Sequence, residues 1–272
     1  MAQQIIVGKA FILDKKIGEG SFGKIFSARK KEEDNTIKNN KYAIKLITKQ
    51  NVWENELTIY SALKSVKNIP YIHAAGTEGK FHYIVMDLLE QNLEQLKESF
   101  KEKMSLNVIL HLALQMLSII EAIHNKGILH RDIKPSNFLL KTNEQNISEL
   151  YLIDFGLSCK LEDNNQQMKC NESLLGTTRY MSVAVQQGWT ASWRDDVESL
   201  GYILIFLQKG ELPWQGSGDM TLPIKQTFGW AYASVNIAGE FILFINYCRA
   251  LPFNEKPNYT YLRGLLTNLL NA

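Results

Sequence analysis

The sequence predicts an α+β fold in which the strands come first and the longest helices come later. Short apolar or alternating runs of strand length fall between Phe11 and Leu89. Apolar residues then recur at helical spacing over Ser105–Lys126, and a second apolar helical segment covers Val197–Leu207. The 272 residues suffice for one large domain or for two smaller lobes.

The first strand-like runs flank a glycine-rich pattern, I-G-E-G-S-F-G-K-I, that begins at Ile17. Glycines let a backbone approach phosphate groups and offer N–H donors to them. A dinucleotide site uses a similar spacing, but there the pattern opens a helix and precedes an acidic residue by about 20 positions. Here strand-like Ile25–Arg29 and the polar run Lys30–Lys41 follow, and we expect the polar run to be a flexible hairpin loop. The pattern therefore favours a hairpin that covers nucleotide phosphates.

A lysine and a glutamate fall on apolar faces of consecutive predicted elements. Lys45 lies on an apolar face of the strand Lys41–Ile47. The helix Asn51–Lys64 has an apolar stripe on which Glu56 falls, whereas Glu54 falls off it. Because a buried carboxylate needs a cation, we predict an ion pair between Lys45 and Glu56. The alternative is a lysine that extends to the surface.

Two loops in the middle of the chain place acidic and amide side chains at the ends of apolar segments. The first, H-R-D-I-K-P-S-N, begins at His130, and the second, D-F-G, begins at Asp154. Phosphoryl transfer needs a carboxylate that receives a hydroxyl proton, oxygen ligands for Mg²⁺, and cations near the transferred group. Asp132 suits the base, Lys134 the cation, and Asn137 with Asp154 the metal ligands. The alternative, ordinary solvated loops, is disfavoured by the order and spacing of both motifs.

Together these motifs resemble those of protein kinases. Most kinases continue with A-P-E, but here the segment Gly176–Val183 reads G-T-T-R-Y-M-S-V. This segment, R-D-D-V-E-S-L-G-Y from Arg194 and L-P-W-Q-G from Leu212 are similar to the casein kinase I family. The resemblance runs from about Ile12 to Leu270, and vaccinia-related and tau-tubulin kinases match these blocks less well.

The resemblance implies a bilobal protein kinase fold. We expect a small antiparallel sheet with one main helix in an N-lobe at residues 1–88, and a mainly α-helical C-lobe at residues 89–272. Together they would form one kinase domain over about 11–270. The implied activity is transfer of the ATP γ-phosphoryl group to Ser or Thr of proteins, with Mg²⁺ as cofactor.

The resemblance also assigns residues to the ATP site. Lys45 would hold the α- and β-phosphates, and Met86 would be the gatekeeper beside the adenine. The backbone of Asp87 and Leu89 would pair with the adenine edge. The residues expected around ATP are Ile17, Gly18, Glu19, Gly20, Ser21, Phe22, Gly23, Lys24, Ile25, Ala43, Lys45, Glu56, Met86, Asp87 and Leu89.

Substrate selection follows from the same resemblance. Family members favour sites with an acidic or phosphorylated residue upstream of the Ser or Thr, which a basic pocket receives. Arg179 and Lys225 align with basic positions of that pocket. Many relatives carry a lysine where this chain has Glu172, and Lys169 compensates in part, so we expect a weaker preference for phosphorylated substrates. We also expect activity without phosphorylation of the activation segment.

Two further roles are implied in the helical part. Asp196 would hold the backbone of the catalytic loop from a central helix, although an acid favoured by the helix dipole is an equally good interpretation. Arg249, which usually pairs with the glutamate of A-P-E, would stay buried without that partner.

Composition excludes several classes of function. A net charge of +2 is too small for nucleic acid or a membrane to be the main partner. Apolar runs such as Tyr202–Leu207 are too short to span a bilayer, and Met1 begins no signal peptide. The three cysteines Cys159, Cys170 and Cys248 are too few and scattered for a disulfide framework. We expect an intracellular monomer, in the cytoplasm or nucleus, whose partners are protein substrates.

Two rival functions remain on the same fold. A pseudokinase that only binds ATP as a scaffold usually lacks the lysine, the base or the metal-binding aspartate, and all three are present here. A phosphotransferase acting on small molecules lacks the L-P-W-Q-G and G-T-T-R-Y blocks.

Overall fold

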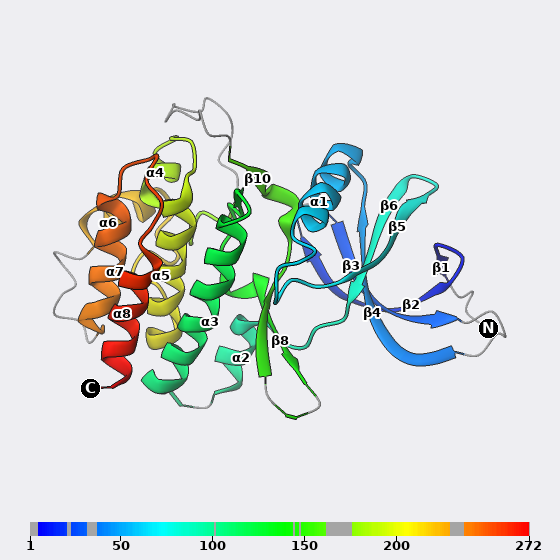
Figure 1. Ribbon diagram of the computed structural model, residues 1–272, viewed down its shortest axis with the longest axis horizontal. Coiled ribbons are helices and arrows are strands. Elements are labelled where there is room, and N and C mark those ends of the chain that lie inside the picture. The colour runs from blue at the N-terminus through cyan, green and yellow to red at the C-terminus, as the bar shows by residue number, and fades with distance from the viewer. Residues whose placement is uncertain are drawn as a thin grey trace. The chain divides into compact units, whose positions relative to one another are not determined.

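The computed structural model describes residues 5–20, 23–31, 37–100, 102–143, 145–146, 148–161, 176–228 and 237–271. The chain forms two compact units. The first contains residues 1–90 together with the short segment 153–156, and the second contains 91–152 and 157–272. In Figure 1 the strands of the first unit are coloured blue to cyan, and the helices of the second run from green to red.

The first unit is an antiparallel sheet with one helix. Its six strands follow the order β1-β2-β3-β4-β6-β5. The elements are β1 (Ile6–Val7), β2 (Phe11–Gly20), β3 (Gly23–Lys31), β4 (Ile37–Ile47), α1 (Gln50–Ala62), β5 (Ile72–Glu78) and β6 (Phe81–Asp87). Helix α1 contacts β4 and β6.

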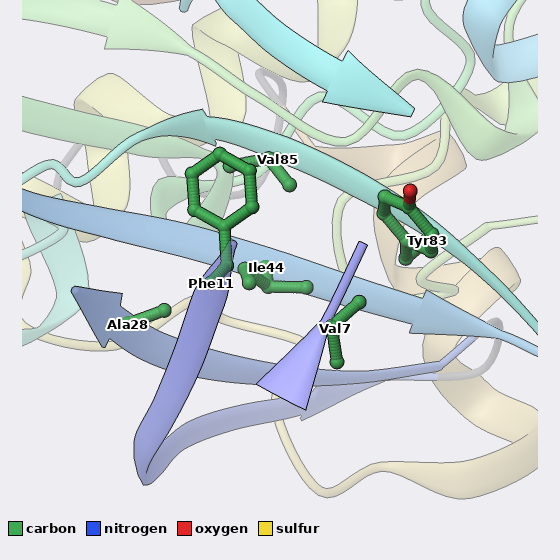
Figure 2. Close-up of a cluster of buried hydrophobic side chains, with 6 residues drawn as sticks. All are labelled: Val7, Phe11, Ala28, Ile44, Tyr83 and Val85. Atoms are coloured by element: carbon green, nitrogen blue, oxygen red, sulfur yellow. The ribbon is translucent and has the colours of Figure 1, made fainter. Parts of the chain in front are cut away.

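Alternating side chains on β4 separate two faces of this sheet. Ile44 belongs to a buried apolar cluster, against which Tyr42 and Leu46 also pack. Figure 2 shows Val7 and Phe11 of β1 and β2 gathered over the same face with side chains of β3, β4 and β6. Lys45 is on the opposite face of the strand, as predicted, so its side chain lies outside this apolar cluster.

The glycine-rich pattern forms a hairpin, as its flanking runs indicate. Gly18 pairs with Ile25, and Gly20 with Gly23, across β2 and β3. The polar run after it was predicted wrongly as a loop throughout: β3 continues to Lys31 and β4 already begins at Ile37. Hydrogen bonding between these long strands outweighs the polar composition, which carries no apolar face to mark a strand.

The second unit is mainly helical. Its helices are α2 (Leu93–Ser99), α3 (Leu106–His124), α4 (Val183–Gln186), α5 (Trp193–Lys209), α6 (Thr221–Thr227), α7 (Gly239–Ala250) and α8 (Tyr259–Leu270), with 3₁₀ turns η1 (Pro135–Asn137), η2 (Phe155–Leu157, which starts in the first unit) and η3 (Gly218–Met220). Helix α3 packs against α5 and α8, and α5 packs against α7 (Figure 1).

Helix α3 is the one helix in the described parts of the chain that is long and apolar enough to cross a membrane. Ten of its side chains are buried within the unit. Contacts with α5, α8 and β9 account for this apolar composition, which is typical of a core helix.

Two short antiparallel pairs frame the central loops. Strand β7 (Ile128–Leu129) pairs with β10 (Cys159–Lys160), and β8 (Phe138–Thr142) pairs with β9 (Ser148–Leu152). The H-R-D loop therefore leaves β7 and enters β8 at fixed points. Its functional side chains are held between two hydrogen-bonded ends.

Two glycines of the hairpin test the packing of the sheet. A Cβ at Gly23 would lie 2.0 Å from the carbonyl oxygen of Leu46, whereas a Cβ at Gly20 would meet no described atom within 4 Å. We predict that Gly23→Ala lowers the free energy of unfolding by about 1–3 kcal/mol through overpacking. Gly20→Ala should change it by no more than about 0.5 kcal/mol. Urea unfolding of both variants measures the difference, and equal stabilities would contradict this packing.

Candidate active site

Lys45 is the centre of an ion-pair network in the first unit. Its Nζ lies 2.8 Å from both carboxylate oxygens of Glu56 and 2.7 Å from Oδ1 of Asp154. Lys45 comes from β4 and Glu56 from α1, and both side chains are buried. The predicted ion pair with Glu56 is confirmed. The second carboxylate partner of Lys45, Asp154, is the first residue of D-F-G.

Burial and charge act in opposite directions on this network. Burial alone would lower the pKa of Lys45, but the carboxylates of Glu56 and Asp154 raise it above its usual value. Burial is also the largest influence on Glu56 and raises its pKa, although Lys45 opposes the shift. The ammonium of Lys45 is therefore kept charged, and the buried carboxylate of Glu56 depends on that positive charge.

The D-F-G segment is held by helix α1. Asp154 has a positive φ of 67°, a conformation that aspartate tolerates better than most residues. Phe155 is fully buried, and its ring meets the ring of Tyr60 edge to face at 5.0 Å. Glu56 and Tyr60, one helical turn apart, thus fix the segment that follows β9.

The other residues expected around ATP lie on adjacent strands. Ala43 and Met86 pair across β4 and β6, and both are buried. The N–H of Asp87 donates to the Tyr71 carbonyl oxygen at 3.2 Å. Ser21 and Phe22 lie outside the described residues. The remaining members are Ile17, Gly18, Glu19 and Gly20 on β2, Gly23, Lys24 and Ile25 on β3, and Leu89 just after β6.

In the second unit, Asp132 is surrounded by hydrogen-bonding partners. Its Oδ2 lies 2.7 Å from Nζ of Lys134. Its Oδ1 accepts hydrogen bonds of 3.0 Å from both the N–H and the hydroxyl of Thr177. Lys134 also donates to the Thr177 hydroxyl at 3.1 Å. The carboxylate, the cation and the hydroxyl therefore form one small cluster.

Asn137 joins the same cluster from the turn η1. Its Nδ2 donates to the main-chain oxygen of Asp132 at 2.8 Å. The amide oxygen is consequently the atom that can ligate a metal. Among the described residues no group of three or more His, Cys, Asp and Glu could hold a metal ion.

The catalytic loop is anchored by the buried carboxylate of Asp196. Its Oδ2 accepts from the N–H of His130 at 2.7 Å, and its Oδ1 accepts from the N–H of Arg131 at 2.9 Å. Burial alone would raise the pKa of Asp196, but a hydrogen bond and the charge of His124 hold it below its usual value. The predicted role is confirmed, and Asp196 also lies in the first turn of α5, where the dipole favours an acid.

Strain and close packing accompany this anchor. Arg131 has a positive φ of 65°, uncommon for a long side chain. Gly176, at φ 104°, approaches the loop so closely that a Cβ there would lie 2.8 Å from the Arg131 carbonyl oxygen. Thr177 is thereby brought to Asp132. The contact of Thr177 with Asp132 was not predicted, because G-T-T-R-Y served only to indicate the family. The available signal was a hydroxyl residue directly after the glycine of that block.

Arg249 pairs with a glutamate that the sequence analysis did not anticipate, in place of the A-P-E glutamate that this chain lacks. Its Nε lies 2.9 Å from Oε1 of Glu198 on α5, and its Nη2 lies 2.9 Å from the hydroxyl of Tyr202. Tyr202 also donates to Glu198. The acid comes from R-D-D-V-E-S-L-G-Y instead of A-P-E, and sequence reasoning missed it because only the fold joins α5 to α7.

The two residues predicted for a substrate anion pocket differ in environment. Arg179 is 40% exposed, with Nη1 4.0 Å from Oε1 of Glu94. Lys225 is fully buried, and its Nζ donates to two main-chain carbonyls and to Gln186. The assignment of Lys225 to the pocket is therefore wrong, because its ammonium is enclosed by protein acceptors. Glu172 and Lys169 lie outside the described residues.

A comparison with protein families identifies the family of this chain. The first unit holds a lysine paired with a glutamate, and the second holds an anchored aspartate beside a lysine and an asparagine. The family model described as "Protein kinase domain" matches residues 11–255. The chain belongs to the protein kinase family, and the predicted fold, with a sheet-rich first part and a helical second part, is confirmed.

The Glu198–Arg249 pair yields a stability prediction. Arg249→Met leaves the buried carboxylate of Glu198 without its cation, so we expect a loss of about 3–5 kcal/mol. In the double variant with Glu198→Gln the second change should recover part of that loss, since no uncompensated charge remains. Chemical unfolding of the four proteins in the cycle gives the coupling energy. Additive losses would show that the pair does not act as a unit.

Proposed function

We propose that this protein is a serine/threonine protein kinase of the casein kinase I type, which transfers the γ-phosphoryl group of ATP to acidic or phosphorylated protein substrates. The observation that carries the proposal is the cluster around Asp132. A carboxylate that accepts from Thr177 and lies beside Lys134 can orient a substrate hydroxyl and take its proton.

The residues fit ATP and Mg²⁺ by the chemistry of their donors. Lys45, kept charged by Glu56, suits the α- and β-phosphates, and Gly20 leaves space for close approach to the backbone. Asp154 in the first unit and Asn137 in the second each offer an oxygen, the ligand type that Mg²⁺ prefers. When bound, the metal supplies positive charge at the phosphate oxygens.

The mechanism assigns a separate task to each side chain of the Asp132 cluster. Asp132 accepts a hydrogen bond from the substrate hydroxyl and then its proton, as the new O–P bond to the γ-phosphorus forms and the bond from that phosphorus to the bridging oxygen breaks, which releases ADP. Lys134 neutralises charge on the transferred group. Thr177 and Asn137 keep the carboxylate in place through hydrogen bonds to its oxygens and to its main chain. The protein contributes position and charge without forming a covalent intermediate.

The substrate class rests on Arg179 and on the resemblance to casein kinase I. Arg179 presents a partly exposed guanidinium, which binds carboxylates and phosphates through paired hydrogen bonds. Of the two residues first assigned to the pocket, only Arg179 is exposed. One cation in place of two supports a modest preference for acidic or phosphorylated sites, in addition to any weakening by Glu172.

One assay tests base, activity and substrate class together. Wild type and Asp132→Asn are given a phosphorylated, an acidic and a neutral Ser peptide and a Tyr peptide, with Asp219→Asn as a control at an exposed acid. We expect kcat of Asp132→Asn to fall about 10²–10⁴-fold with unchanged nucleotide affinity. Wild type should prefer the phosphorylated and acidic peptides.

Other outcomes would contradict particular parts of the proposal. Nucleotide binding without transfer to any peptide would favour an ATP-binding scaffold. Equal rates on the phosphorylated and neutral Ser peptides would remove the assigned substrate class but keep the kinase. Transfer only to the Tyr peptide would exclude a serine/threonine kinase.

A further inference from the structure

Lys225, on α6, is a charged side chain buried without a role in the mechanism above. It is among the largest fully buried side chains in the described part of the chain. Its Nζ donates to the main-chain oxygens of Thr178 and Met181, each at 2.7 Å, and to Oε1 of Gln186 at 3.0 Å. An ammonium has three protons. All three are used by acceptors of the protein.

Aromatic rings complete the enclosure of this ammonium. Nζ lies 5.3 Å from the ring centre of Tyr202 and 5.4 Å from that of Trp214. Both distances are within the range of cation–π attraction. Burying an ammonium is unfavourable unless its protons are bonded, so an apolar side chain would satisfy packing at less cost. The charge therefore has a function beyond filling space.

The acceptors identify that function, because they belong to the segment that reaches the catalytic base. Thr178 follows Thr177, whose N–H and hydroxyl donate to Asp132. The N–H of Met181 turns back to the carbonyl oxygen of Thr177 at 3.1 Å. Between them, the carbonyl oxygen of Arg179 accepts from Nε1 of Trp214 at 2.7 Å. Lys225 and Trp214 thus hold three carbonyls of a turn that starts at Thr177.

We propose that Lys225 is a positioning residue for phosphoryl transfer: by holding the carbonyls of Thr178 and Met181 it keeps Thr177 bonded to Asp132. The inference rests on the proposed phosphotransferase activity, which the rate of the wild type tests separately. It replaces the substrate-binding role first predicted for this lysine. Lys225 acts through Thr177 and touches no reacting atom.

The protonation of Lys225 offers a direct readout. Burial lowers its pKa to about 7, while Glu198 on α5 opposes the shift and Arg249 on α7 adds to it. Above that pH the neutral amine keeps two N–H donors for three acceptors. The hold on the turn should weaken as pH rises.

The first test compares Lys225→Met with Lys126→Met, which alters an exposed lysine in the turn after α3. At pH 6 we expect Lys225→Met to lower kcat about 10- to 100-fold at unchanged nucleotide KM, the scale on which a displaced catalytic group affects rate. The deficit should shrink towards pH 9. Unchanged kcat, or a deficit equal at every pH, would overturn the proposal.

The stability of wild type relative to Lys225→Met has the opposite pH dependence. It therefore distinguishes an effect on the position of Thr177 from an effect on folding. The unfolded chain takes up the lysine proton near pH 10.5, the folded chain only near 7. Wild type should therefore gain stability relative to Lys225→Met as pH rises from 7 to 10.5. If Lys225 only stabilised the fold, the kcat of wild type relative to Lys225→Met would rise with pH as the relative stability does. That result would contradict the proposal.

The last test asks whether the effect passes through Thr177. Thr177→Val removes the hydroxyl but keeps the N–H of residue 177, so in this background Lys225→Met should lower kcat by less than it does in wild type, and fully additive losses would overturn the proposal. If Lys225→Met does not fold, Gln186→Leu serves instead, since it removes one of the three acceptors and should lower kcat in the same direction. Full activity of a folded Gln186→Leu with an unchanged pH profile would count against the proposal.

Discussion

The buried carboxylate of Asp196 is the constraint on which the H-R-D loop of this protein depends. Its two oxygens accept from consecutive N–H groups at the start of the H-R-D loop. These two fixed amides orient the main chain at the next residue, Asp132, and so determine the direction of its side chain. An ionised acceptor is needed for both bonds at once, and the lowered pKa of Asp196 keeps it ionised. The strained φ of Arg131 is tolerated because the anchor over-determines it.

Each unit buries charge in order to fix a functional segment. In the first, Lys45 joins helix α1 to the D-F-G aspartate. In the second, Asp196 holds one loop, and Lys225 holds the turn that follows Gly176. Replacing buried charges by apolar side chains often leaves stability unchanged or improves it, so geometry is the better explanation for retaining them. The Glu198–Arg249 pair is a further ion pair of the second unit, which joins α5 to α7.

Sequence reasoning could predict the features that depend on the residue pattern within a single strand or helix. The hairpin followed from glycines between strand-like runs, and the Lys45–Glu56 pair followed from polar residues on two apolar faces. Both depend on periodicity along a single element. The roles of Thr177 and Glu198 could not be found this way, because each contacts a residue more than 40 positions away. Lys225 was misassigned because alignment gives a residue type but not whether acceptors already surround it. Strands β3 and β4 were predicted too short, because the polar ends that extend them to Lys31 and back to Ile37 lack an apolar face.

Asp196 positions Asp132 through the main chain of the H-R-D loop, and the rate of phosphoryl transfer by Asp196→Asn tests this role. The rate is measured at saturating nucleotide and peptide, in protein shown to be folded by circular dichroism. An asparagine can accept from one N–H but offers its amide to the other, so the rate should fall about tenfold or more, one strong hydrogen bond being worth about 1.5–3 kcal/mol. A folded Asp196→Asn variant with the wild-type transfer rate would contradict the account.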